Sequence, residues 1–316
     1  MTRLPLEGMK VLDCTQIMAG PFCTLLLADM GAEVVKVEKP NGGEDHRRHA
    51  PFINDWSVPF LAMNRNKRSI ALDLKKPEGR RVFEQLVTQH EVVVENFRPG
   101  TMERLGLGYD RLIELNSSLI YCSISGFGRT GPYKNRGGFD LIAQAMSGLM
   151  SFTGIAGEAP VKVGVPIGDL NAGMYGAYGI LCAYIHRLRT GEGQMVDTSL
   201  LEGSLAYTFW QAVVYFSTGE IPGPLGSAHP LTAPYQAFRT KDTFIVVGAA
   251  TQRPWESLCR SLNREDLLTD SKYATVGDRK KNEIELARIL ENTFLTKHTD
   301  YWLDLLEQAG VPAAPI

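Results

Sequence analysis

Short apolar runs alternate with longer amphipathic runs through the first 130 residues. Residues 10–14 and 33–38 have the apolar, β-branched pattern of buried strands, and residues 22–32 between them have helical spacing. Pro21 suits the first position of this helix and Gly31 suits its C-terminal end. The order strand, helix, strand predicts one unit of a parallel sheet.

The same alternation continues to about residue 130. It predicts further strands over 69–74, 91–97 and 119–128 and a helix over 77–89. We therefore expect this part of the chain to form an open α/β layer. No GxGxxG follows the first strand and no GxxxxGK(S/T) occurs in the sequence, so neither type of nucleotide phosphate loop is predicted.

The pattern changes in the second half of the chain. Residues 139–218 have mainly helical spacing, and residues 219–242 are rich in Gly and Pro. Residues 243–250 read as a strand, and three helices are predicted after it. The chain stops at Ile316 within an apolar pattern, so we expect either a truncated chain or a further segment.

Composition excludes several classes of protein. With 316 residues the chain is beyond the size at which one core stops growing, so two domains are expected. Its 33 basic and 35 acidic residues nearly cancel, which argues against nucleic acid or a membrane surface as partner. No apolar stretch approaches the roughly 20 residues of a membrane span, and the first ten residues lack the apolar core of a signal peptide.

Cysteine usage indicates a reducing compartment. No two cysteines form a CxxC pair, and no histidine has neighbours at metal-ligand spacing. We expect a cytoplasmic protein without a structural metal, whose free thiols are mostly buried. The five cysteines are Cys14, Cys23, Cys122, Cys182 and Cys259.

Asp169 stands where a loop becomes a helix rich in small residues. One interpretation is a helix cap, in which the carboxylate accepts a backbone N–H of the first turn. The other is a carboxylate presented to a substrate, because the small residues that follow allow close approach. The helix dipole favours the anion, so we expect an ionised carboxylate, as a nucleophile requires.

Basic residues lie next to several predicted strands. Arg65, Lys67 and Arg68 precede one strand and Lys75 and Lys76 follow it, as either a solvated edge or a phosphate site. Single cations follow other strands, where ligands bind in open α/β sheets, and their spacing fits a long ligand with separated phosphates. These cations are Lys39, Arg98 and Arg104. A lone loop histidine, His229, is either a general base or a structural residue.

Taken in order, the motifs of this chain resemble the class III coenzyme A transferases. This is the family of formyl-CoA transferase, the carnitine-pathway CoA transferase and α-methylacyl-CoA racemase. The motifs that carry the resemblance include LEGMKVLDCTQIMAGP (6–21), NRNKRSIALDLKKPEG (64–79), VENFRPGTMERLGLGYD (94–110), GFDLIAQAMSG (138–148), GDLNAGMYGA (168–177) and GVPAAPI (310–316).

The resemblance implies a fold and an assembly. It implies an α/β large domain with a Rossmann-like open parallel sheet, a smaller α+β domain and a ring-shaped subunit of an interlocked homodimer. On this basis we expect a large CoA-binding domain over 1–190, a helical linker over 191–225 and a small domain over 226–316. A C-terminal return to the large domain is absent from this sequence.

The resemblance also implies a reaction and its residues. Asp169 would be the nucleophile, passing through an aspartyl acyl anhydride and an aspartyl-CoA thioester. Coenzyme A would be a substrate, with a small carboxylic acid as its partner and no tightly bound cofactor. The residues matched to CoA binding are Met18, Ala19, Lys39, Leu72, Lys75, Asn96, Phe97, Arg98, Arg104, Arg136 and Phe139.

Acceptor residues are matched less closely. Gly248 and Ala249 match a glycine-rich lid of formyl-CoA transferase but are poorer in glycine, and His229 joins them as a candidate contact for the acceptor. A dicarboxylate acceptor would need a further cation, for which the candidates are Arg47, Arg48 and Lys162.

One departure separates the branches of the family. The racemases carry a histidine base where this chain has Phe139, which favours the transferases. Among these, the motifs look most like enzymes that use succinyl-CoA with dicarboxylate acceptors. A 2-methylacyl-CoA racemase and a catalytically silent CoA-binding protein remain the alternatives.

Overall fold

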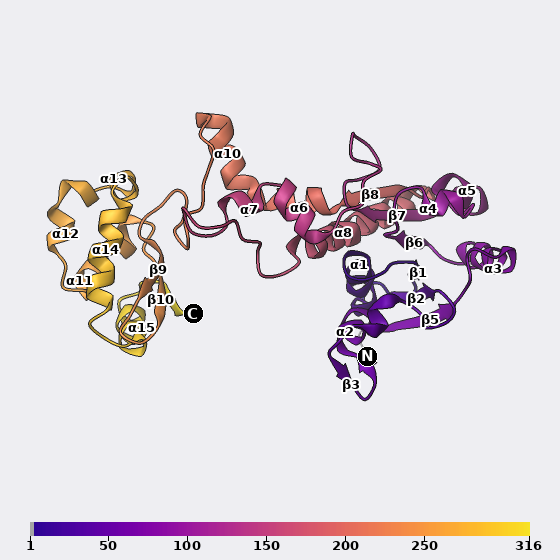
Figure 1. Ribbon diagram of the computed structural model, residues 1–316, viewed down its shortest axis with the longest axis horizontal. Coiled ribbons are helices and arrows are strands. Elements are labelled where there is room, and N and C mark those ends of the chain that lie inside the picture. The colour runs from indigo at the N-terminus through magenta and orange to yellow at the C-terminus, as the bar shows by residue number, and fades with distance from the viewer. Residues whose placement is uncertain (1–2) are drawn as a thin grey trace. The chain divides into compact units, whose positions relative to one another are not determined.

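The computed structural model describes residues 3–316, which form two compact units (Figure 1). Unit 1 contains the chain up to Ser151 and Pro160–Ile221, and unit 2 contains Phe152–Ala159 and Pro222–Ile316. The division between Ile221 and Pro222 lies close to the boundary predicted at residue 225. The short segment Phe152–Ala159, which we had assigned to the large domain, packs with unit 2 instead.

Unit 1 is built on a six-stranded sheet in which every pair of neighbours is parallel. Its order is β5-β2-β1-β6-β7-β8. The chain adds strands outward in one direction from β1 and then in the other from β6, which is the doubly wound arrangement. The strands are β1 (Lys10–Asp13), β2 (Glu33–Glu38), β5 (Lys67–Ala71), β6 (Val92–Glu95), β7 (Ile120–Ser125) and β8 (Met195–Ser199).

The sixth strand corrects one prediction. Met195–Ser199 lies within the stretch 191–225 that we expected to be a helical linker, but it pairs with β7, with Val196 opposite Cys122. Its sequence, MVDTS, is short and mixed in polarity, so no strand pattern is visible before the pairing is known. The other five strands overlap those predicted from the apolar runs. The strand predicted over 69–74 is shifted, because β5 spans Lys67–Ala71 and so includes Lys67 and Arg68, which we expected before it.

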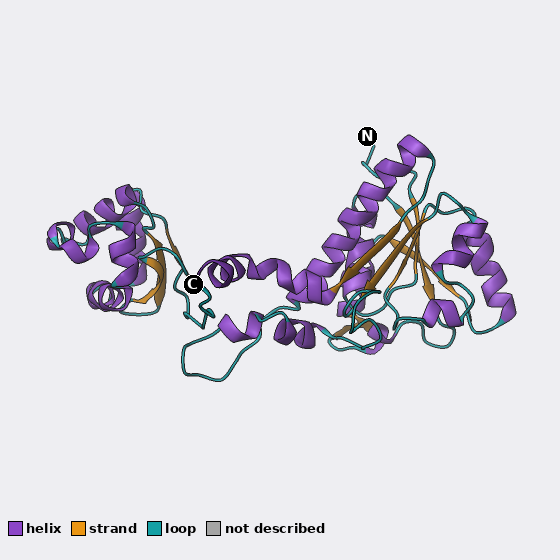
Figure 2. Ribbon diagram, turned by 90° about the horizontal axis from the view of Figure 1, so that it is seen from above, coloured by secondary structure: helices purple, strands orange, loops and turns teal. Residues whose placement is uncertain are grey.

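Both faces of the sheet are covered by helices (Figure 2). The helices α1 (Ala19–Asp29) and α8 (Ile167–Thr190) cover one face, where they pack on Val92 and Val94 of β6. The neighbouring Val93 points to the other face and packs with residues of α3 (Pro77–Val87), α4 (Thr101–Arg104) and α5 (Tyr109–Leu115). This alternation explains why Val92, Val93 and Val94 of β6 form an unbroken apolar run.

Small residues let α8 pack tightly against its neighbours. A Cβ atom on Gly173 would lie 2.6 Å from the backbone oxygen of Ala19 in α1. A Cβ atom on Gly203 of α9 (Leu200–Leu205) would lie 2.9 Å from the backbone nitrogen of Ala172 in α8. The small residues after Asp169 are therefore used for helix packing, and not for the close approach of a ligand.

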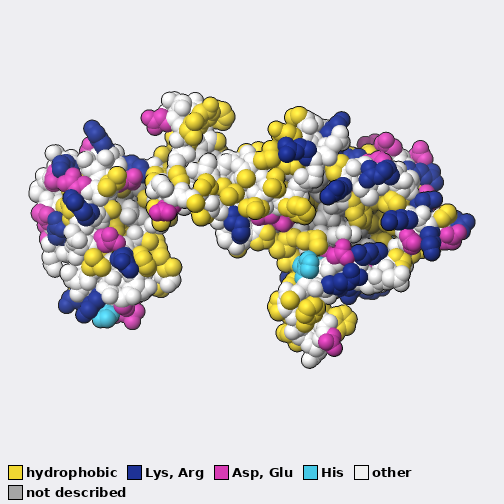
Figure 3. Space-filling model, in the orientation of Figure 1, with side chains coloured by type: hydrophobic (Ala, Val, Ile, Leu, Met, Phe, Trp, Pro, Cys, Tyr) yellow, Lys and Arg dark blue, Asp and Glu magenta, His cyan; other side chains and the backbone are white. Residues whose placement is uncertain are grey.

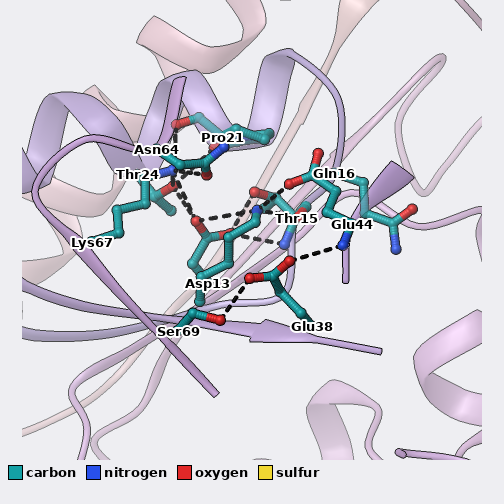
Figure 4. A network of polar contacts seen from close by, with 12 residues as sticks. Asp13, Thr15, Gln16, Pro21, Thr24, Glu38, Glu44, Asn64, Lys67 and Ser69 are labelled. Carbon is teal, nitrogen blue, oxygen red and sulfur yellow. Dashed lines mark hydrogen bonds and ion pairs between the residues drawn. The ribbon is translucent and has the colours of Figure 1, made fainter. Parts of the chain in front are cut away.

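Buried charges tie the ends of β1, β2 and β5 together (Figure 4). The carboxylate of Asp13 lies 3.0 Å from Nζ of Lys67, and the same Nζ is within 3.1 Å of oxygens of Pro21, Thr24 and Asn64. Burial alone would raise the pKa of Asp13, but Lys36 and Lys67 outweigh it and hold this pKa well below its usual range. Lys67 is thus neither a solvated cation nor free to bind phosphate.

The remaining elements of unit 1 lie outside this sheet. A short antiparallel hairpin of β3 (Phe52–Ile53) and β4 (Trp56–Ser57) precedes α2 (Val58–Asn64), and Figure 1 labels β3 and α2. The others are η1 (Asp45–Arg48), α6 (Asp140–Met146), η2 (Ala206–Thr208) and α10 (Phe209–Thr218), while α7 (Leu149–Phe152) spans the boundary of the units.

Unit 2 has its own core. An antiparallel sheet of β9 (Tyr235–Arg239), β10 (Phe244–Gly248) and β11 (Ala313–Pro315) has β10 in the middle. Phe238 and Val247 pack there against Trp255 and Phe294 from the helices. These helices are α11 (Gln252–Ser261), α12 (Asp266–Thr269), η3 (Ser271–Tyr273), α13 (Val276–Lys281), α14 (Glu283–Phe294) and α15 (Thr299–Gln308).

Two further expectations concern the whole chain. No helix within residues 3–316 has both the length and the apolar character needed to cross a membrane. All five cysteines are free, and four are buried as expected, whereas Cys182 on α8 is exposed.

Candidate active site

A cavity of about 420 Å³ opens where the winding of the sheet reverses, between β1 and β6. Gln16–Ala19 follow β1, and Asn96–Pro99 follow β6, so both loops leave the carboxyl ends of neighbouring strands. Open α/β sheets bind their ligands at this position, because the two loops diverge and leave a crevice. Ser125 and Gly126, at the end of β7, line the same cavity.

Eight of the predicted site residues meet in this cavity. They come from four separate segments of the chain, and the catalytic candidate is among them. These residues are Met18, Ala19, Asn96, Phe97, Arg98, Arg136, Phe139 and Asp169.

Asp169 is not the cap of its helix. It is the third residue of α8, whose N-cap position is taken by Pro166 without any capping side chain. Asp140, at the start of α6, performs this function from a distance. Its Oδ1 accepts the backbone N–H groups of Gly168 at 2.8 Å and of Asp169 at 3.3 Å. The capping interpretation of Asp169 is therefore wrong, and its carboxylate is available to face the cavity.

The environment of Asp169 favours its neutral form. Burial raises the pKa of this carboxyl, and the nearby Asp140 carboxylate raises it further, to about 7. We expected full ionisation from the helix dipole, and the pKa contradicts this. The dipole acts mainly within the first turn, where Asp140 already occupies the two N–H groups of Gly168 and Asp169. Both the neutral and the ionised form of Asp169 are thus populated near neutral pH.

Two arginines stand beside the cavity. The side chains of Arg98 and Arg136 are exposed, and both residues line its wall. The guanidinium carbon of Arg136 lies 4.8 Å from the centre of the Tyr133 ring, a cation–π contact that restricts its position. Phe139, which is 75% exposed, adds an apolar surface to the same wall. This wall combines positive charge with apolar area, as a long anionic ligand with an uncharged arm would require.

Asn96 lines the cavity and also holds a neighbouring loop. Its side-chain amide forms two hydrogen bonds of 2.8 Å with the backbone of Gln16, accepting from its N–H and donating to its oxygen. Both ends of the amide are therefore used to hold the loop after β1. Asn96 thereby shapes the cavity, and these two bonds leave one N–H of its side-chain amide unused.

The other predicted phosphate contacts lie outside this cavity. Nζ of Lys39 pairs with Asp45 at 2.6 Å on the surface. Arg104 lines a second hollow, of about 400 Å³, together with Arg80 and Arg81. Leu72 packs partly buried against the core under α3, and Lys75 follows it.

The candidate acceptor residues of unit 2 are mostly committed to their own unit. The backbone N–H groups of Gly248 and Ala249 donate to Pro312 and Pro234, and Ala249 is fully buried. These two residues therefore offer no free donor. The ring of His229 stacks on that of Tyr235 at 5.1 Å, and its Nδ1 accepts the N–H of Leu231 at 3.1 Å. This bond assigns the ring proton of neutral His229 to Nε2.

The cations proposed for an acceptor also differ in availability. Arg47 forms a two-pronged pair with the buried carboxylate of Glu38, at 2.7 and 2.6 Å, so it is not free. Arg48 lies 3.6 Å from Asp45, and Lys162 contacts only a neighbouring backbone oxygen at 3.1 Å. Within residues 3–316 no group of three or more metal-binding side chains comes together.

Sequence reasoning missed the contribution of Asp140. The signal was present, because an acid at the start of a predicted helix, in GFDLIAQ, is a typical capping residue. Only the fold shows that the helix it caps is α8 and not its own. Gln16 and Ile17 were also missed as lining residues, since neither carries a charge or a catalytic group.

Comparison with known proteins supports the resemblance seen in the motifs. The model of CoA-transferase family III matches residues 6–316. The succinyl-CoA:glutarate CoA-transferase of Mus musculus is 42% identical over 313 residues, which cover 99% of this chain and 72% of that protein. The succinyl-CoA:mesaconate CoA-transferase of Haloarcula hispanica is 45% identical over 320 residues, which cover 98% of this chain and 80% of that protein.

Solved structures have the same architecture. A CAIB/BAIF family protein from Brucella suis is 38% identical with a TM-score of 0.88, covering 100% of this chain and 84% of that one. The protein Rv3272 from Mycobacterium tuberculosis is 33% identical with a TM-score of 0.90 and the same coverage.

Proposed function

The chain belongs to CoA-transferase family III, and from this membership we propose that it transfers coenzyme A from succinyl-CoA to a dicarboxylic acid. Similar proteins named for glutarate and mesaconate support this choice of acceptor. The observation that carries the proposal is Asp169, a carboxylate relieved of capping that lines a cavity at the switch point of the sheet.

Asp169 acts as the nucleophile. Its ionised oxygen attacks the thioester carbonyl of the donor, and loss of CoA thiolate leaves a mixed anhydride on Asp169. The thiolate then attacks the aspartyl carbonyl, which releases the donor acid and forms an aspartyl-CoA thioester. The acceptor carboxylate attacks this thioester, giving a second anhydride and thiolate again. Attack of the thiolate on the acceptor's carbonyl releases the new acyl-CoA and regenerates the carboxylate of Asp169.

Each of these steps passes through an oxyanion that needs hydrogen-bond donors. In the first turn of α1, Pro21 has no N–H and that of Phe22 donates to Met18, which leaves the N–H groups of Ala19 and Gly20 without an acceptor in their own helix. Ala19 lines the cavity. The corresponding groups of α8 already donate to Asp140. We therefore assign the oxyanion contacts to the start of α1.

Coenzyme A carries phosphates at one end and an uncharged pantetheine arm at the other. We propose that Arg98 and Arg136 bind its anionic part beside the cavity, with Met18, Phe97 and Phe139 along the arm. Lys39, Leu72, Lys75 and Arg104 are the proposed contacts of its adenosine and outer phosphates. The basic hollow around Arg104 supports a phosphate there.

We further propose that the protein works as a homodimer. The helix α10 has no buried residue, although it is strongly apolar. Figure 3 shows this apolar surface in yellow. A ten-residue helix with such exposure is unstable in water without a partner, and a second copy of the chain is the partner we assign. The most exposed side chains are Phe209, Trp210, Val213, Tyr215 and Phe216, at 47–83%.

The function is tested by incubating the protein with succinyl-CoA and a panel of mono- and dicarboxylates. We expect acyl-CoA product with glutarate or mesaconate, and hydroxylamine should trap an acyl group on Asp169. The variant Asp169→Asn keeps the size of the side chain and should lose activity at least a thousandfold while still binding CoA. Full activity of this variant contradicts the proposal.

A racemase would give a different result. It would exchange the α-proton of a 2-methylacyl-CoA with deuterium from the solvent in the absence of any acceptor acid. Binding of CoA without turnover on any acid would identify a silent binding protein.

A further inference from the structure

Ile17 has a conformation that its residue type rarely adopts. It lies in the loop between β1 and α1 with φ at +67°, in the left-handed region, although its side chain is β-branched. The residue is 41% exposed and lines the same cavity as Asp169. Such strain persists only where surrounding contacts impose it, and it is frequent at functional sites.

The backbone of this loop is held on both sides of the strained residue. The N–H of Ile17 donates to Oε1 of Glu44 at 2.5 Å. On the other side, Asn96 binds the N–H and the oxygen of Gln16. The polar contacts of two distant segments therefore converge on two consecutive residues.

Glu44 is itself held in place by Lys36 and Glu38. It is 2% exposed, and its Oε2 lies 2.7 Å from Nζ of Lys36. The same Nζ donates to the backbone oxygen of Thr15 at 2.8 Å, and the N–H of Glu44 donates to Glu38 at 2.8 Å. Figure 4 shows Glu44 next to Thr15 and Gln16 in this network. The buried ion pair of Lys36 and Glu44 therefore contacts the backbone of this loop at Thr15 and at Ile17.

We propose that Glu44 is a positioning residue for acyl-CoA binding. By holding Ile17 in the left-handed conformation, it sets the direction in which the chain enters Met18 and Ala19, which line the cavity of Asp169. The inference rests on the proposed function, because it assigns the purpose of this geometry to acyl-CoA. Glu44 acts through Ile17 and need not touch the substrate.

The proposal predicts a rescue that a purely structural role does not. The variant Glu44→Ala should raise the KM for succinyl-CoA about tenfold and change kcat less than about threefold, because the reacting groups stay in place. Glycine adopts positive φ without strain. The double variant Ile17→Gly with Glu44→Ala should therefore have a KM within about threefold of that of Ile17→Gly alone. If the double variant keeps the tenfold defect, Glu44 contributes only to stability and the proposal is overturned.

A second substitution tests the same contact without disturbing the buried pair. Ile17→Pro removes the N–H that Glu44 accepts and forces φ to about −65° in an exposed loop. It should raise the KM as Glu44→Ala does, and it decides the question if Glu44→Ala does not fold. A wild-type KM in folded Ile17→Pro overturns the proposal.

The matched control is Asp29→Asn, which removes a carboxylate paired with Arg65 and Asn66 at the other end of α1. Its KM should equal that of the wild type. Calorimetric titration with CoA gives an independent readout. If the wild type binds CoA but transfers nothing, the proposed function fails, while weaker CoA binding by Glu44→Ala and its recovery in the double variant still support the positioning role.

Discussion

The carboxylate of Asp140 accepts the backbone N–H groups of Gly168 and Asp169, and thereby caps α8 from outside the helix. The two acids lie 29 residues apart in the sequence. One holds the end of α8, and the other is left to line the cavity. Their proximity has a second effect, because the charge of Asp140 adds to burial in raising the pKa of Asp169 to about 7.

The pH dependence of the reaction should reflect the interaction between Asp140 and Asp169. The nucleophile is the ionised form, so kcat/KM for succinyl-CoA should rise with pH through an apparent pKa near 7. Asp140→Asn removes the like charge but keeps an oxygen for capping, so the acidic limb should move to lower pH. The profiles are measured from pH 5 to 9 with both proteins, and an unmoved limb contradicts this electrostatic coupling.

Loss of the nucleophile should stabilise the fold at alkaline pH. The pKa of Asp169 is higher in the folded protein than its usual value near 4, so ionisation opposes folding, and stability falls as the pH rises from 4 through 7. Asp169→Asn does not titrate. Its unfolding free energy should exceed that of the wild type by about 1–2 kcal/mol at pH 8, after a discount for partial exposure. Urea unfolding at pH 8 and pH 4 measures the difference, which should vanish at the lower pH.

The arginines beside the cavity should control affinity for the donor. Arg98→Gln and Arg136→Gln should each raise the KM for succinyl-CoA about tenfold with little change in kcat, because each removes a charged contact to phosphate. Arg68→Gln is the control, since Arg68 pairs with Glu33 at the edge of the sheet. Equal KM values for all three variants would place the phosphates elsewhere.

The buried Lys67 should matter for stability. Lys67→Ala leaves Asp13 with one cation fewer inside the protein and should lower the unfolding free energy by about 3–5 kcal/mol. Arg65→Ala removes a surface ion pair with Asp29, the last residue of α1. It should lower the unfolding free energy by less than about 1 kcal/mol. Denaturant titration compares the two variants. Similar losses of unfolding free energy would contradict a larger contribution from the buried ion pair.

The apolar surface of α10 should hold two copies together. Phe216→Glu places a charge on the most exposed residue of that helix and should shift the protein from dimer to monomer in light scattering at micromolar concentration. Ile284→Glu is the matched control, because Ile284 is equally exposed but lies on α14 of unit 2. A wild type that is already monomeric contradicts the proposed dimer.

Much of unit 1 could be predicted from local pattern. The buried strands β1, β2, β6 and β7 are mainly apolar, because both faces of the sheet are covered, and such runs are visible without any tertiary information. The strand β8 could not be found in this way. Its five residues alternate little and become a strand only through pairing with β7.

The sequence by itself determined the family, the parallel sheet and the identity of Asp169 as the acid to examine, because motifs, apolar runs and helix signals are local properties of the chain. Tertiary structure alone decided the state of the charged groups. Whether Lys67 is buried, and whether Asp169 caps its helix or carries a proton, depends on residues such as Asp13 and Asp140 that are far away in the sequence. Burial and Coulomb interactions act through space, and the chain reveals them only after it has folded.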